Sequence, residues 1–134
     1  MKYTHVENYI NGKFVAASTS KKLAVISPVD GSHLSDVPLS TSQDLDTAVK
    51  AAKAAFPAWS KTPIKERVQV FFKYKTLLER DIKELAALCS EENGKTYSES
   101  IAEIEKSIEL TEFATSLPQL VAGEILEVSK GVEC

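Results

Sequence analysis

The chain has 134 residues and a formal net charge of −3, from 16 Lys and Arg against 19 Asp and Glu. Hydrophobic residues make up 43% and charged residues 26%, an ordinary soluble globular composition. The net acidity argues against nucleic acid as the main partner. No apolar run reaches the roughly 18 residues that span a membrane, and the N-terminus does not resemble a signal peptide. The low number of cysteines, two, and the lack of a recognisable leader favour a reducing compartment, and we expect a cytoplasmic location.

The first 40 residues predict two short antiparallel strand pairs. Asn11-Gly12 tolerates the two positive φ angles of a type I′ turn, which predicts a hairpin over residues 9–15. The second pair comprises residues 23–26 and 33–39, separated by a proline- and glycine-containing turn. Pro38 should lie at an edge or at the end of its strand, because proline cannot donate to a sheet ladder.

An amphipathic helix is predicted next, because apolar residues recur every three or four positions over residues 45–56. Thr41 or Ser42 is the expected N-cap. Asp44 would lie in the first turn, where the helix dipole favours a carboxylate. Pro57 is expected to end this helix or to lie just beyond its last turn.

A second, longer helix is expected to begin with Thr62 as its N-cap and Pro63 at the first helical position, where a missing N–H costs little. Gly94 is the expected left-handed cap at its end. An apolar stripe runs along about seven turns of this helix and is predicted to be buried. The stripe consists of Phe71, Tyr74, Leu78, Ile82, Leu85 and Cys89.

A third helix is predicted from a capping box, in which Thr96 is the N-cap and Glu99 follows three residues later. It should run to about Leu117 and be stopped by Pro118. The sequence thus predicts an α+β fold in a single unit, residues 1–134. Short strands occupy residues 1–40, three amphipathic helices residues 41–118, and a β-leaning tail residues 119–134. The tail is most β-like over residues 125–128, and its two glycines suggest bends.

Residues 94–96, Gly-Lys-Thr, have the form of the end of a phosphate-binding loop. That motif requires another glycine at the position of Cys89 and a strand before the loop. Glu91 and Glu92 would also repel a phosphate. We therefore interpret this segment as a helix cap followed by a capping box.

The sequence offers no complete catalytic, cofactor-binding or metal site. Cys89 is expected near a helix C-terminus, where the dipole disfavours a thiolate, so core packing is the favoured role. Cys134 is the last residue. His5 and His33 have no His or Cys at metal-ligand spacing. No two glycines are spaced for a Gly-x-Gly-x-x-Gly dinucleotide turn.

Two further groups of residues could be functional or merely structural. Carboxylates on the third helix could perform acid–base chemistry, but a solvated helix face is the favoured interpretation. Aromatic residues near the second helix are expected mainly in the core, although part of their surface is a candidate for meeting a partner. The carboxylates are Glu99, Glu103, Glu105, Glu109 and Glu112. The aromatic residues are Trp59, expected in a connection, and Phe71, Phe72 and Tyr74.

Five short motifs follow one another along the chain. They are Asn-Tyr-Ile-Asn-Gly-Lys at residues 8–13, Ser-Pro-Val-Asp-Gly at residues 27–31, Ala-Val-x-x-Ala-x-x-Ala-Phe-x-x-Trp at residues 48–59, Arg67, and Glu-Asn-Gly-Lys at residues 92–95. In this order they resemble the N-terminal part of the aldehyde dehydrogenase superfamily. Residues 8–13 are similar to its opening strand turn, and residues 27–31 are similar to its Asn-Pro-x-x-Gly turn, with Ser at the position of the usual Asn. Residues 48–59 resemble its first helix, and the last two motifs match its next two landmarks.

Residues 112–114, 117–118 and 123–124 most resemble the methylmalonate-semialdehyde dehydrogenase branch. The resemblance implies a parent enzyme that oxidises a semialdehyde with NAD and passes the acyl group from a cysteine thioester to coenzyme A. It places the nucleophile, the general base, the oxyanion asparagine and the cofactor-binding residues after residue 134. We therefore expect this chain to bind no cofactor and to be inactive alone. The tail would belong to the oligomerisation region.

The resemblance also implies that the helices cover a parallel sheet absent from this chain. We therefore expect the chain to pair with itself as a homo-oligomer, through helix faces or tail strands. The alternative is a self-contained helical interaction or oligomerisation module without catalysis. Several hundred further codons in the reading frame would favour the enzyme, and a natural stop after Cys134 would favour the module.

Overall fold

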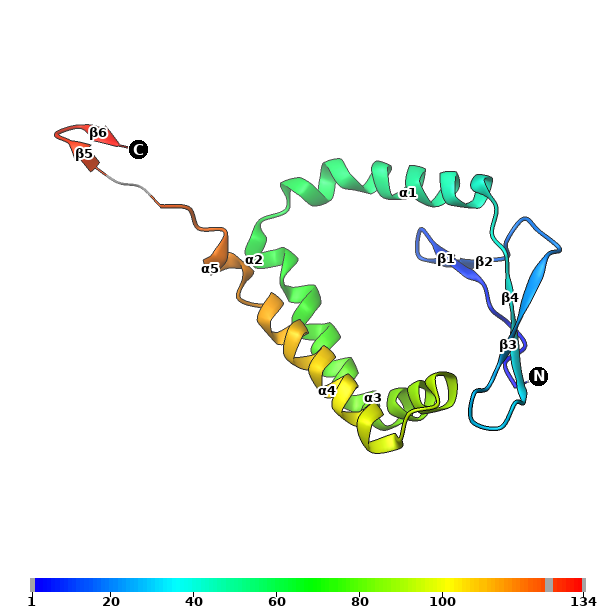
Figure 1. Cartoon of the computed structure of the whole chain (residues 1–134). Helices are drawn as coiled ribbons and strands as arrows, with labels where there is room; N and C mark the ends of the chain where they lie inside the picture. Colours follow the sequence, from blue (N-terminus) through cyan, green and yellow to red (C-terminus); the bar gives the residue numbers. More distant parts are fainter. Residues whose placement is uncertain (1, 125–126, 134) are drawn as a thin grey trace.

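The computed structural model describes residues 2–124 and 127–133. Short strand pairs lie at the N-terminal side, a long helix α1 crosses above them, and helices α3 and α4 return side by side below (Figure 1). The chain ends in a small hairpin that stands apart from the helices. This mixture of short antiparallel strands and amphipathic helices confirms the predicted α+β class.

The first hairpin forms as predicted. Strands β1 (Asn8–Ile10) and β2 (Lys13–Val15) pair antiparallel, with Tyr9 opposite Phe14. Asn11 and Gly12 have φ angles of 52° and 76°, the two positive values that a type I′ turn requires.

The second strand pair is also confirmed. Strands β3 (Lys22–Ile26) and β4 (His33–Pro38) pair antiparallel, and Lys22 lies opposite Pro38. Pro38 is the last residue of its strand, as expected for a residue that cannot donate to the ladder. Leu34 and Ser35 on β4 are buried, so this strand supplies part of the core.

Helix α1 (Ser42–Lys61) begins at a capping box on Thr41, one of the two predicted N-caps. Pro57 lies inside this helix, so the prediction that it would end the helix is wrong, and Trp59 is helical too. Pro57 has no N–H for the carbonyl of Lys53, but both residues are exposed, so water can hydrate that carbonyl. The helix ends instead at Lys61, just before Thr62-Pro63.

The predicted start of the second helix is also corrected. Thr62 precedes a proline, which disfavours the helical region. It is extended, with φ −66° and ψ 129°, and forms the C-cap of α1. Pro63 is the N-cap of α2 (Ile64–Arg67), not its first residue. The buried Val68 then separates α2 from α3 (Gln69–Asn93), so one predicted helix is two.

The end of α3 and its apolar stripe follow the prediction in part. Gly94 adopts φ 78° and donates its N–H to the carbonyl of Ser90 at 2.9 Å, the predicted left-handed cap. Within the stripe Leu78 is buried, and Phe71, Ile82, Leu85 and Cys89 are half-buried. Tyr74 is 51% exposed, contrary to the prediction.

Helix α4 (Tyr97–Ala114) begins at Thr96 as predicted but ends three residues before Leu117. Pro118 does not stop this helix. It lies in the first turn of the short α5 (Leu117–Leu120), where a backbone N–H would have no hydrogen-bond partner within the helix, so its absence costs little.

The tail forms a two-stranded hairpin from β5 (Glu127–Ser129) and β6 (Val132–Glu133), with Gly131 at φ 76° in its turn. The predicted β segment at residues 125–128 falls partly on residues 125–126, which lie outside the described residues.

The core is small. The buried apolar residues in the described part of the chain are Leu34, Val68, Leu78 and Ala86. In α1, which the structure describes in full, no residue is buried. None of the described helices is long and apolar enough to cross a lipid bilayer.

Candidate functional site

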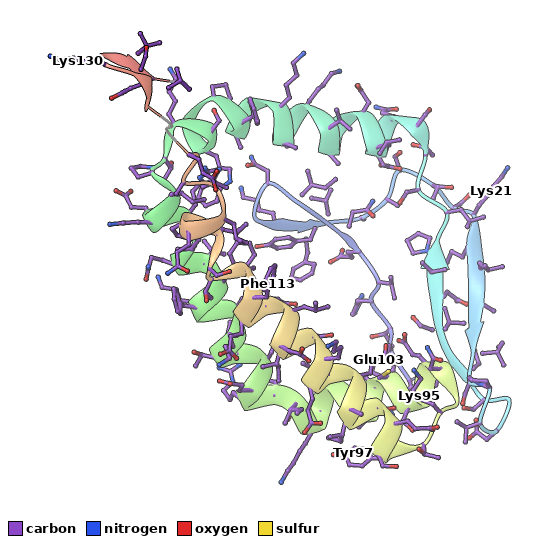
Figure 2. All side chains as sticks on the ribbon, turned by 60° about the vertical axis from the view of Figure 1, so that its left-hand side comes forward. Lys21, Lys95, Tyr97, Glu103, Phe113 and Lys130 are labelled. Atoms are coloured by element: carbon purple, nitrogen blue, oxygen red, sulfur yellow. The ribbon has the colours of Figure 1, made fainter. Side chains whose placement is uncertain are left out.

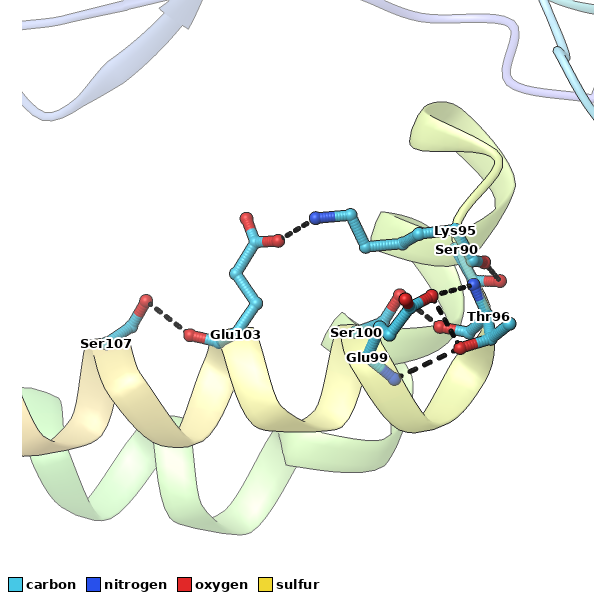
Figure 3. Close-up of polar contacts among 7 residues, drawn as sticks. All are labelled: Ser90, Lys95, Thr96, Glu99, Ser100, Glu103 and Ser107. Carbon is cyan, nitrogen blue, oxygen red and sulfur yellow. Dashed lines mark hydrogen bonds and ion pairs between the residues drawn. The ribbon is translucent and has the colours of Figure 1, made fainter.

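The junction between α3 and α4 brings together several of the residues that the sequence singled out, among them Lys95, Thr96, Glu99 and Glu103 (Figure 3). Lys95 follows the left-handed cap, and its ammonium forms an ion pair with Glu103 on α4. The hydroxyl of Ser90 donates to the carbonyl of Lys95 at 2.8 Å. The Lys95 ion pair lowers the pKa of the Glu103 carboxyl and raises that of the Lys95 ammonium.

A capping box closes this junction. The N–H of Thr96 donates to Glu99 Oε2 at 2.9 Å, and the N–H of Glu99 donates to Thr96 Oγ1 at 3.3 Å. Hydrogen bonds from the side chain and backbone of Thr96 hold the pKa of Glu99 below its usual range. The N–H of Thr96 therefore serves the helix cap. The cap interpretation of residues 94–96 is confirmed, because they join two helices and the element directly before them is α3 rather than a strand.

Cys89 lies on α3 beside this junction and is half-buried. A hydrogen bond with the Cys89 thiol contributes to the lowered pKa of Glu103, after the larger effect of Lys95. It is not at a helix N-terminus but near the C-terminal end of α3, and a packing role remains the interpretation. Cys134 lies outside the described residues.

The two histidines are far from this junction in sequence and differ in their surroundings. Nε2 of His33 lies 2.8 Å from Oδ1 of Asp36, both on β4, and His5 is exposed. Among residues 2–124 and 127–133, no group of three or more His, Cys, Asp or Glu residues could hold a metal ion.

The carboxylates of α4 are distributed along an exposed surface. Glu109 pairs with Lys106 at 2.7 Å, and Glu112 pairs with Lys75 on α3 at 3.2 Å. With Glu103 paired to Lys95 and Glu99 in the cap, these carboxylates fit the solvated helix face that was favoured over acid–base chemistry, and the structure adds the ion pairs. The remaining carboxylate, Glu105, is exposed.

Most of the aromatic side chains that were predicted to lie mainly in the core are exposed, so this prediction is wrong for them. Trp59, Phe72 and Tyr74 are exposed, whereas Phe71 is half-buried. Phe113 on α4 is also exposed, and its position is labelled in Figure 2. Phe72 and Tyr74 thus remain candidates for contact with a partner.

The pairing of Tyr9 with Phe14 was missed at the level of sequence. Their rings meet edge to face with centroids 5.0 Å apart, and both side chains are largely exposed. The register of a two-residue hairpin turn places these residues opposite each other, so the signal was available.

An open hollow of about 700 Å³ lies between the N-terminal segment, the β3–β4 turn and α3. The ammonium of Lys2 and the hydroxyl of Tyr3 both donate to Glu91, at 2.7 Å and 2.8 Å. These bonds lower the pKa of the Glu91 carboxyl. The polar groups here therefore hold the N-terminal segment against α3.

The residues do not fit a dinucleotide-binding turn. All five glycines have positive φ, but they lie in five separate segments of the chain, one of them the cap of α3. A Gly-x-Gly-x-x-Gly turn requires them to gather between one strand and one helix. A nicotinamide cofactor would need other residues than these.

The sequence profile of the aldehyde dehydrogenase family matches residues 14–134. The chain belongs to the aldehyde dehydrogenase family. Its similarity to malonate-semialdehyde dehydrogenase 1 of Geobacillus thermodenitrificans is 46% identity, over 96% of this chain and 27% of that protein. Malonate-semialdehyde dehydrogenase of Bacillus pumilus is 43% identical over 96% of the chain and 26% of its own length. This aldehyde dehydrogenase chain thus spans about a quarter of these relatives, in their N-terminal part.

Solved structures agree with this assignment. A Sinorhizobium meliloti protein described as a methylmalonate-semialdehyde dehydrogenase, complexed with NAD, matches 99% of this chain and 27% of its own, with a TM-score of 0.90 and 34% identity. The methylmalonate-semialdehyde dehydrogenase of Oceanimonas doudoroffii matches 98% of this chain and 27% of its own, with a TM-score of 0.90 and 32% identity. The open arrangement of strands and helices is therefore that of the N-terminal part of the family fold.

Proposed function

We propose that this chain is the N-terminal portion of an NAD-dependent aldehyde dehydrogenase that oxidises methylmalonate semialdehyde, or a related semialdehyde, to an acyl-CoA. The observation that carries the proposal is the agreement along nearly the whole chain with the malonate-semialdehyde dehydrogenase of Geobacillus thermodenitrificans, at 46% identity. Two solved relatives described as methylmalonate-semialdehyde dehydrogenases support the same substrate class.

NAD is the proposed cofactor of the complete enzyme, and coenzyme A is its proposed co-substrate. The Sinorhizobium meliloti relative was solved with NAD, which supports the first assignment. The second follows from the resemblance to the methylmalonate-semialdehyde branch. We propose that this chain by itself binds neither molecule; for NAD, its glycines are too far apart to form a dinucleotide-binding turn.

The proposed contribution of this chain is structural. Aldehyde oxidation of this kind requires a reactive thiolate and donors for an oxyanion. Cys89 is half-buried near the C-terminal end of α3, so it lacks the exposed position and the helix N-terminus that are typical of a nucleophilic cysteine. We therefore propose that the nucleophile is not Cys89 and that the 134-residue chain is catalytically silent.

The test is NAD reduction with malonate and methylmalonate semialdehyde, with and without coenzyme A. The 134-residue chain is compared with the product of its complete reading frame and with the Cys89→Ser variant of that product. We expect NADH only from the complete product and little effect of Cys89→Ser. Turnover by the 134-residue chain would overturn its proposed inactivity. Failure of the complete product with both substrates, while other aldehydes are oxidised, would overturn the substrate class.

A further inference from the structure

We draw no further inference here: the strongest candidate, the exposed apolar face that helix α1 presents beside the β1–β2 hairpin, carries none because nothing in the structure shows what covers it.

Discussion

Asp44 shows how a single side chain joins two segments at the start of α1. Its carboxylate accepts hydrogen bonds from the N–H and the hydroxyl of Thr41, at 2.7 Å and 2.9 Å. It also accepts a hydrogen bond from the N–H of Ser18 at 3.0 Å, which ties the loop between β2 and β3 to the helix. These bonds, the Thr41 backbone bond foremost, lower the pKa of Asp44 to about 2. The charged form is therefore stabilised by folding.

This shift predicts a pH-dependent loss of stability. Because the folded pKa is about 2 and the ordinary value is 3.8, the contribution of Asp44 is present above the ordinary value and is lost as pH falls toward 2. Asp44→Asn cannot titrate, so its stability should fall less over this window than that of the parent chain. Urea unfolding followed by circular dichroism at several pH values measures the difference. Asp46→Asn, which removes an exposed ion pair with Lys50, is the control. Equal pH dependence of Asp44→Asn and the parent chain would contradict this account.

Gly94 is a second residue whose identity the local geometry demands. It has φ 78°, and a Cβ there would lie 3.1 Å from Cγ of Pro28. Gly31 has a similar φ of 74°, but a Cβ there would meet no atom within 4 Å. A side chain at Gly31 would therefore introduce backbone strain alone, whereas a side chain at Gly94 would introduce backbone strain and a steric contact with Pro28.

We expect Gly31→Ala to lower the free energy of unfolding by about 1 kcal/mol through backbone strain. Gly94→Ala should cost more, because the turn that carries Pro28 must also shift. Equilibrium urea unfolding measures both variants. In a Pro28→Ala background, which removes the Cγ contact but keeps the Cβ at 3.3 Å, the cost of Gly94→Ala should fall toward that of Gly31→Ala. Equal losses in the two single variants would show that the Pro28 contact contributes nothing.

At the scale of elements, the start of a helix follows from the capping residues near it. Whether a helix continues past a proline does not follow from the local sequence. The capping boxes at Thr41 and Thr96 start α1 and α4 where the sequence predicted them. Pro57 interrupts the hydrogen bonds of α1 without ending it, whereas Pro118 occupies the first turn of α5. The same residue type therefore has different energetic consequences in the two helices.

Pro57→Ala is expected to stabilise α1. The substitution restores an N–H that can donate to the carbonyl of Lys53, and removes a cost of about 3 kcal/mol for proline in a helix interior. The greater flexibility of the unfolded chain offsets part of this, so we expect a net gain of about 2 kcal/mol. Far-UV circular dichroism and urea unfolding measure helix content and stability. Pro118→Ala, in a first turn, should change either quantity little. Similar effects at the two prolines would contradict the argument.

At the scale of the whole molecule, the chain buries little of its apolar surface. Leu45 and Phe56 on α1 are 65% and 66% exposed, and they are three helical turns apart on the same apolar stripe. Exposed apolar patches of this kind drive association in water. The tail hairpin adds two strands that lie apart from the helices (Figure 1).

The isolated 134-residue chain is therefore expected to self-associate. Sedimentation velocity over a range of concentrations should show species heavier than a monomer. The double variant Leu45→Glu/Phe56→Glu should shift the distribution toward monomer. Lys50→Glu, which changes the charge on the same helix and leaves the apolar stripe in place, should not. A strictly monomeric mass for the unaltered chain at all concentrations would contradict this prediction.

The candidate site was predictable where short-range chemistry controls it. The cap at Gly94 and the capping box at Thr96 follow from residues a few positions apart, so they could be read without the fold. The pairing of Lys95 with Glu103 was not foreseen, because its geometry depends on how the backbone turns between α3 and α4. The exposure of Tyr74 was also missed, since apolar spacing predicts a helix face but not whether another element covers it.

The amino-acid sequence was sufficient for the hairpin turn, the strand pairs, three helix-forming regions and the family, because caps, turns and ordered motifs act over a few residues. The folded arrangement was needed to learn that α1 continues through Pro57, that Val68 divides α2 from α3, and that the stripe of α1 stays exposed. These outcomes depend on the contacts and solvent around each segment. The burial of a side chain depends on which other elements pack against it, and a short stretch of sequence does not specify those elements.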